Sequence, residues 1–150
     1  MNELNFIIKN KLDLDDFRIK PISGMNYLIN NSRDLVYFAK KTLSKEMVTC
    51  ERDGIQKLSA HINTPEVILC HNNWIITKYV EPSKKDGDLS QILKLHHDSK
   101  IDRTTYGLDH SNFIGPTPQK NDPTTSWVDF FIENRLRLQI DLLKSNGHDL

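Results

Sequence analysis

The 150-residue sequence has no excess of charge of either sign and no long apolar run. Lysine and arginine number 20, as do aspartate and glutamate, so the formal net charge is zero. A chain without a global positive field is not expected to bind nucleic acid or an anionic membrane surface. A transmembrane helix needs about 20 consecutive apolar residues, whereas the apolar runs here are only a few residues long, so we expect no membrane span.

Cysteine is also scarce. Cys50 and Cys70 have no spacing typical of metal ligands, and we expect both to be free thiols in a reducing compartment. A redox switch at Cys50 is the alternative, and it would require a lowered thiol pKa. Residues 1–9 contain neither the basic start nor the long apolar core of a signal peptide. Together these absences predict a cytoplasmic protein.

The residues that are present suit one ordinary globular domain. Charged residues make up 27% and the mean hydropathy is −0.53, values typical of a folded, soluble chain. The pattern predicts, in order, a helix over 2–12, strands over 17–22, 27–29 and 35–40, a helix from the Ser44 N-cap to about residue 60, strands over 67–69 and 74–77, and helices over 88–97 and 124–144. This order alone predicts an α+β fold in which a helix packs on an antiparallel sheet.

The most informative segment lies between Tyr106 and Gln139. It contains Tyr106-Gly107, Asn112, Gly115, Thr117-Pro118-Gln119, Asn121, Trp127, Phe130-Phe131 and Arg135-Leu136. These residues and spacings resemble the signature of the fructosamine (ketosamine) kinase family, a small-molecule branch of the protein-kinase-like phosphotransferases. An aminoglycoside- or choline-kinase-like protein is the weaker alternative, and the Thr-Pro-Gln-x-Asn block argues against it.

The resemblance implies a domain organisation. Residues 1–80 would form a protein-kinase-like small lobe, an antiparallel sheet plus a helix. Residues 81–87 would be the hinge or linker, and residues 88–150 the first helices of an incomplete large lobe that carry the signature.

The resemblance also implies residues that anchor ATP. Lys40 stands at the end of the predicted third strand, in the place of the kinase lysine that pairs with the α- and β-phosphates. Glu51 matches the glutamate that holds this lysine in position. Lys41 and Glu46 are the competing positions.

The rest of the implied nucleotide site is less distinctive. Gly24 would lie in the loop that covers the phosphates, but relatives usually have two glycines and a longer loop there, and a plain turn explains Gly24 equally well. Adenine would be bound by the backbone of Tyr79 or Val80.

On the substrate side, the resemblance points to Asn112, Gln119 and Asn121. Their loop contains two prolines and two amides, which suits a rigid, hydrogen-bonded turn, and scaffolding is the alternative role. For Arg135 we favour a helix-surface charge over a ligand contact. Leu138 replaces a proline common in relatives, which predicts an uninterrupted last helix.

No catalytic or metal-binding residue can be assigned. The family's His-Gly-Asp-Leu-Trp catalytic sequence is not found among the 150 residues, and residues 147–150 read Gly-His-Asp-Leu, with the first two in reversed order. His96 and His97 are adjacent, so on a helix they would point about 100° apart and could not readily share a metal ion. We therefore expect no useful kinase activity from this chain alone, with Mg²⁺ bound only if the missing half is supplied.

Several partners follow from these expectations. The resemblance implies a ketoamine-type small molecule or a glycated protein as substrate. The last predicted helix has an apolar surface made of Phe130, Phe131, Leu136, Ile140 and Leu143. Left uncovered, this surface would favour self-association or binding of a missing C-terminal half. A non-catalytic nucleotide- or protein-binding module, or half of a split kinase, is the alternative function.

Overall fold

The computed structural model describes residues 2–32, 36–82, 90, 92–93 and 104–148. The chain divides into two compact units, Met1–Asp98 and Ser99–Leu150. In the described part of the chain, no helix is both long and apolar enough to cross a membrane.

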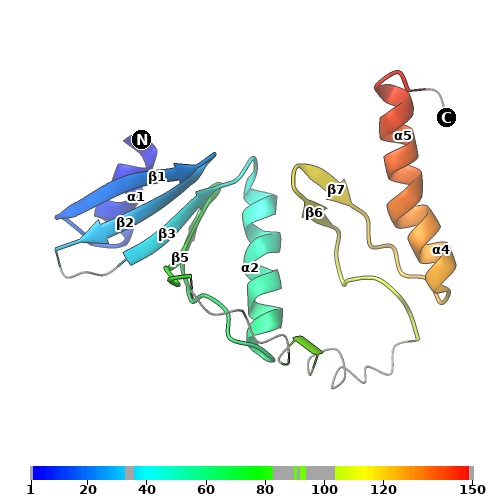
Figure 1. Ribbon diagram of the computed structural model, residues 1–150, viewed down its shortest axis with the longest axis horizontal. Helices are drawn as coiled ribbons and strands as arrows, with labels where there is room; N and C mark the ends of the chain where they lie inside the picture. The colour runs from blue at the N-terminus through cyan, green and yellow to red at the C-terminus, as the bar shows by residue number, and fades with distance from the viewer. Residues whose placement is uncertain (1, 33–35, 83–89, 91, 94–103, 149–150) are drawn as a thin grey trace. The chain divides into compact units, whose positions relative to one another are not determined.

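The first unit is built on a five-stranded antiparallel sheet (Figure 1). Its elements are α1 (Asn2–Lys11), β1 (Phe17–Ser23), β2 (Asn26–Asn31), β3 (Val36–Lys41), α2 (Lys45–Ser59), β4 (Val67–His71) and β5 (Trp74–Lys78). The strand order is β1-β2-β3-β5-β4, and every neighbouring pair is antiparallel. The predicted α+β class, with an antiparallel sheet and a packed helix, is confirmed, and the strand and helix bounds differ from the predicted ones by a few residues.

A different helix packs on each face of this sheet. The main core lies on the α1 face and consists of Leu4, Ile7 and Ile8 of α1 with Ile29, Ala39, Trp74 and Ile76 of the sheet. Because successive strand residues point to opposite faces, Lys40, which follows Ala39, lies on the other face. That face is the one on which α2 packs, through β4 and β5.

The start of α2 is fixed in two ways. The hydroxyl of Ser44 accepts a hydrogen bond from the Met47 N–H (3.3 Å), as expected for an N-cap. The hydroxyl of the buried Thr42 lies within hydrogen-bond distance of the carbonyls of Ser44 (2.7 Å) and Asn73 (3.1 Å). The helix therefore begins at a defined point beside the β4–β5 turn, and this sets the position of the side chains that α2 presents to the sheet.

The second unit contains a short hairpin and a long helical segment. The hairpin pairs β6 (Asn112–Ile114) with β7 (Thr117–Gln119). Gly115 (φ +55°) and Pro116 form its two-residue turn, in which glycine supplies the positive φ at the first central position. The predicted rigid turn is thus a hairpin.

The helical segment comprises α4 (Trp127–Phe131), the π-helix η1 (Ile132–Leu136) and α5 (Arg137–Ser145). The predicted start at residue 124 is wrong, because Thr124 is bridged to Tyr106 and Ser126 is the N-cap. The helix is continuous, but it is not α-helical throughout.

Some predictions fall outside the described residues. Most of the helix expected over 88–97 lies there, including His96 and His97, as does most of the hinge expected over 81–87. The predicted domain boundaries in this region stay predictions.

Candidate functional site

The first candidate site centres on an ion pair between a strand and a helix. The Nζ atom of Lys40 in β3 lies 2.7 Å from Oε2 of Glu51 in α2. About a third of each side chain is exposed, so the pair faces solvent on one side. Neighbouring strands fix Lys40 between Asn26 of β2 and Ile75 of β5.

The two competing residues have other partners. Lys41 projects to the α1 face, where its Nζ lies 2.9 Å from Glu3 Oε2 and 5.5 Å from the centre of the Trp74 ring. The hydrogen bond from Lys41 lowers the pKa of Glu3 below its usual value. Glu46 lies in the first turn of α2, where a hydrogen bond with Ser44 is the main cause of its lowered pKa. The pair is therefore Lys40 with Glu51.

Gly24 lies in a tight turn at the same end of the sheet as Lys40. Ser23 pairs with Asn26, so the turn consists of Gly24 and Met25, with φ +55° at Gly24. The Lys41 N–H donates to the Met25 carbonyl (2.9 Å), which ties the turn to the end of β3. A turn this short presents few backbone N–H groups to a phosphate.

The two predicted adenine-binding residues differ in what their backbones can offer. The Tyr79 N–H donates to the Val36 carbonyl (3.0 Å) and so continues the β3–β5 ladder. Val80, at the following position, is 61% exposed. Of the two residues, Val80 is therefore the better candidate for an N–H that faces a ligand.

The predicted substrate-side residues meet in a hydrogen-bonded cluster in the second unit. Asn121 is buried, and its Nδ2 donates to the His110 carbonyl (2.9 Å) and to Asn112 Oδ1 (3.1 Å). Gln119 pairs with Asn112 across the hairpin. The structure thus brings Asn112, Gln119 and Asn121 into one loop assembly, and a role in substrate binding stays a prediction.

Arg135 locks this assembly to the helix. Its guanidinium donates to Asn121 Oδ1 (2.7 Å) and to the Lys120 carbonyl (2.6 Å), and it stacks on Phe130 at 4.8 Å. The expectation of a helix-surface charge is wrong for Arg135, because side chain–loop bonds hold the guanidinium against the signature loop.

Two further residues belong to this cluster, and neither was given a role from the sequence. Asn134 is buried and donates to the Asp122 carbonyl (3.3 Å). Gly107 has φ +125°, and a Cβ at this position would lie 2.7 Å from the Asn121 carbonyl oxygen and 3.2 Å from the Phe130 ring. The signal for Gly107 was its place in the Tyr106-Gly107 pair. Asn134 is a buried polar residue inside an apolar helix pattern, and no local sequence signal indicates its role.

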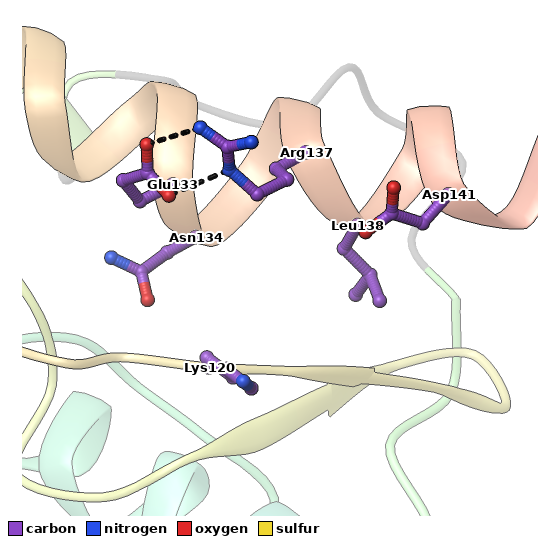
Figure 2. Close-up of a pocket in the computed structure, with 6 residues that line it drawn as sticks. All are labelled: Lys120, Glu133, Asn134, Arg137, Leu138 and Asp141. Carbon is purple, nitrogen blue, oxygen red and sulfur yellow. Dashed lines mark hydrogen bonds and ion pairs between the residues drawn. The ribbon is translucent and has the colours of Figure 1, made fainter.

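A small cavity lies between Lys120 and the helix, as Figure 2 shows. It has a volume of about 100 Å³ and is lined by Lys120, Glu133, Asn134, Arg137, Leu138 and Asp141. Both nitrogens of Arg137 that face Glu133 donate to its carboxylate at 2.7 Å, and this lowers the pKa of Glu133 and raises that of Arg137. A volume of about 100 Å³ is well below the roughly 300–1,000 Å³ typical of small-molecule sites, so this cavity is a weaker candidate than the Lys40–Glu51 site.

No group of three or more His, Cys, Asp or Glu side chains is arranged as a metal site within the described ranges.

Comparison with known proteins decides the family. The family model described as "Fructosamine kinase" matches residues 20–150, which is most of the chain. The chain belongs to this family. The match includes β3, α2 and the whole signature segment. Residues 1–19 precede it, and they contain α1 and the first three residues of β1.

Curated relatives carry kinase names. A "Probable ketoamine kinase" of Vibrio parahaemolyticus is 31% identical over 138 residues, which cover 81% of this chain and 46% of the relative. One from Enterococcus faecium is 29% identical, covering 74% of this chain and 42% of the relative. A chloroplastic protein-ribulosamine 3-kinase of Oryza sativa is 33% identical over 81 residues, covering 51% of this chain and 23% of the relative.

Solved structures agree with the family fold. A "Putative fructosamine-3-kinase" from Haemophilus somnus superposes with a TM-score of 0.74 at 26% identity, covering 96% of this chain and 54% of that chain. One from Thermobifida fusca gives a TM-score of 0.72 at 17% identity, a likeness of fold alone. The chain spans less than half the length of the curated relatives it matches and about half of the first solved structure.

Proposed function

We propose that this chain forms the ATP-anchoring part of a kinase that phosphorylates ketoamine sugars. The observation that carries the proposal is the Lys40–Glu51 pair, in which an ammonium on the third strand is held 2.7 Å from a carboxylate on the following helix. Kinases use this arrangement to hold a lysine against the phosphates of ATP.

The geometry suits that task for a physical reason. A lysine side chain has several rotatable bonds, and an acceptor on a fixed helix restricts the position of its charge. Phosphoryl transfer depends almost entirely on positioning and on electrostatic stabilisation. A lysine ammonium that is already held in place contributes to both. Asn26 lies beside Lys40 in the sheet, and the Gly24–Met25 turn closes the same end.

The substrate follows from the family. The relatives named as ketoamine and ribulosamine kinases support a ketoamine-type small molecule or a glycated protein. The proposal assigns ATP anchoring to these 150 residues. It assigns neither the catalytic base nor the Mg²⁺ ligands to them, since the His-Gly-Asp-Leu-Trp sequence is not among them.

Thermal unfolding with and without MgATP tests the proposal. A ligand at about 100 times its dissociation constant adds about 2.7 kcal/mol of stability, which corresponds to a rise in Tm of roughly 5–11 °C. We expect Lys40→Ala to abolish this rise. Lys41→Ala is the matched control, because Lys41 lies on the opposite face of the same strand, and its variant should keep the rise. No rise in the wild-type chain, or an equal rise in Lys40→Ala, would contradict the proposal.

A second candidate function is that of a non-catalytic binding module. The observation in its favour is the helix α5, in which no residue is buried, although Ile140, Leu142 and Leu143 are apolar. A partner or a second copy of the chain would cover these side chains. Light scattering that shows a stable dimer, together with no response to MgATP, would favour this function over ATP anchoring.

A further inference from the structure

An aromatic cavity opens in the second unit beside the N-terminus of α4. Its volume is about 280 Å³, close to the lower end of the roughly 300–1,000 Å³ typical of small-molecule sites. Tyr106, Trp127 and Phe130 supply aromatic walls, and Asn121 and Arg135 supply polar groups. A mostly apolar lining with a few polar groups is the usual composition of such a site.

One wall of this cavity is the indole of Trp127, which is held by its neighbours and is still accessible. The Trp127 ring contacts Tyr106 edge-on at 5.6 Å, Phe130 in a stack at 5.9 Å and Phe131 at 5.8 Å. Even so, Trp127 is 54% exposed. The Tyr106 N–H donates to the Thr124 carbonyl (2.7 Å), which holds the tyrosine ring beside the start of the helix. A rigid, half-exposed ring is a surface that a ligand can cover at little cost in conformational entropy.

Arg135 gives the cavity a positive charge that its own neighbours do not neutralise. Its hydrogen bonds go to three neutral oxygens, the carbonyls of Lys120 and Asn134 and Oδ1 of Asn121. Among the ion pairs of the described residues, none involves Arg135. A guanidinium has five N–H donors, and three are used in these bonds. The cavity therefore favours a ligand with oxygen acceptors and disfavours a ligand's ammonium group.

We propose that this cavity binds the sugar part of a ketoamine. The choice of ligand rests on the function proposed above, whereas the cavity itself does not. The C–H face of the sugar lies on the Trp127 ring, and its hydroxyl oxygens accept hydrogen bonds from Arg135. The protonated amine of the ketoamine points away from the cavity, because Arg135 repels it.

Quenching of tryptophan fluorescence by acrylamide tests this inference on the whole 150-residue chain. Trp74 is buried and Trp127 is half exposed, so quenching reports mainly on Trp127. Nα-acetyl-fructosyl-lysine should lower the quenching constant about twofold, with a dissociation constant on the order of 1 mM or lower. Nα-acetyl-lysine, which lacks the sugar, should give no protection. Equal protection by both compounds, or none from the sugar compound at about 50 mM, would overturn the inference.

Two variants add a second readout by titration calorimetry with the same ketoamine. Trp127→Ala should weaken binding at least about tenfold, because it removes the ring on which the sugar lies. Val128→Ala is the matched control, since Val128 is adjacent, exposed and not part of the lining, and it should bind as wild type does. Circular dichroism checks that both variants are folded. Equal weakening in the two variants would also overturn the inference.

The test of the sugar site and the test of ATP anchoring can fail independently of each other. A chain that shows a Lys40-dependent response to MgATP but no protection by the ketoamine overturns this inference alone. Protection by the ketoamine without any response to MgATP overturns the proposed ATP anchoring and leaves the sugar site standing.

Discussion

At the scale of single residues, Lys40 and Lys41 are adjacent in sequence, but their glutamate partners lie on opposite faces of the sheet. Ala39 is fully buried against α1, so the alternation along β3 sends Lys40 to the α2 face and Lys41 back toward Glu3. From the sequence alone, a slip of one residue would have exchanged the two lysines. Family resemblance predicted the Lys40–Glu51 pairing, and the structure shows the contact.

Glu51→Gln removes the negative charge of the Lys40–Glu51 pair and keeps the size and shape of the side chain. The variant should weaken MgATP binding about tenfold, because Lys40 loses the carboxylate that fixes its ammonium. The stability of the fold should change by less than about 1 kcal/mol, since an ion pair of which about a third is exposed contributes little. Titration calorimetry and urea unfolding provide the two measurements. Glu46→Gln is the control and should change neither, so a similar loss of ATP affinity in both variants would argue against a specific role for Glu51.

At the scale of elements, the signature segment is a hairpin and loop locked onto a helix by Asn121, Asn134 and Arg135. Sequence reasoning predicted the helix from its apolar pattern and the loop from its prolines and amides. It did not predict the π-helix Ile132–Leu136, since residues 132–136 contain neither glycine nor proline. In the structure, Asn134 and Arg135 within this π-helix bond the loop oxygens of Asp122 and Lys120. Such bonds join residues 12 or more positions apart, and a local pattern does not encode them.

Gly107→Ala tests how tightly this segment is packed. The substitution forces a side chain into a positive-φ conformation and places its Cβ 2.7 Å from the Asn121 carbonyl oxygen. Backbone strain of this kind costs about 1–3 kcal/mol, and the overlap adds to it, so we expect a loss of at least about 3 kcal/mol. Urea unfolding followed by tryptophan fluorescence measures it.

Gly115→Ala is the control for this prediction. Gly115 also has a positive φ, but no atom lies within 4 Å of the added Cβ, so only the conformational cost of about 1 kcal/mol is expected. Equal losses in the two variants would show that the close contact at Gly107 does not contribute.

At the scale of the whole molecule, the chain has a family fold and two separate candidate sites, one in each unit. The antiparallel sheet could be predicted from strand alternation and the α2 cap from Ser44. The pairing of β5 with β3 joins strands that are not consecutive in the chain, and a local pattern does not encode it. The hinge expected over residues 81–87 stays a prediction, because residues 83–89 lie outside the described part of the chain.

The central claim is that Lys40, and not Lys41, faces ATP. The two lysine side chains are about equally exposed, 38% and 34%, so an amine-acylating reagent should modify both in the free chain. Acylation in the presence of MgATP, read residue by residue by peptide mass spectrometry, tests the claim most directly. We predict that MgATP protects Lys40 and leaves Lys41 as reactive as before. Protection of Lys41 alone, equal protection of both lysines, or no protection of either would contradict it.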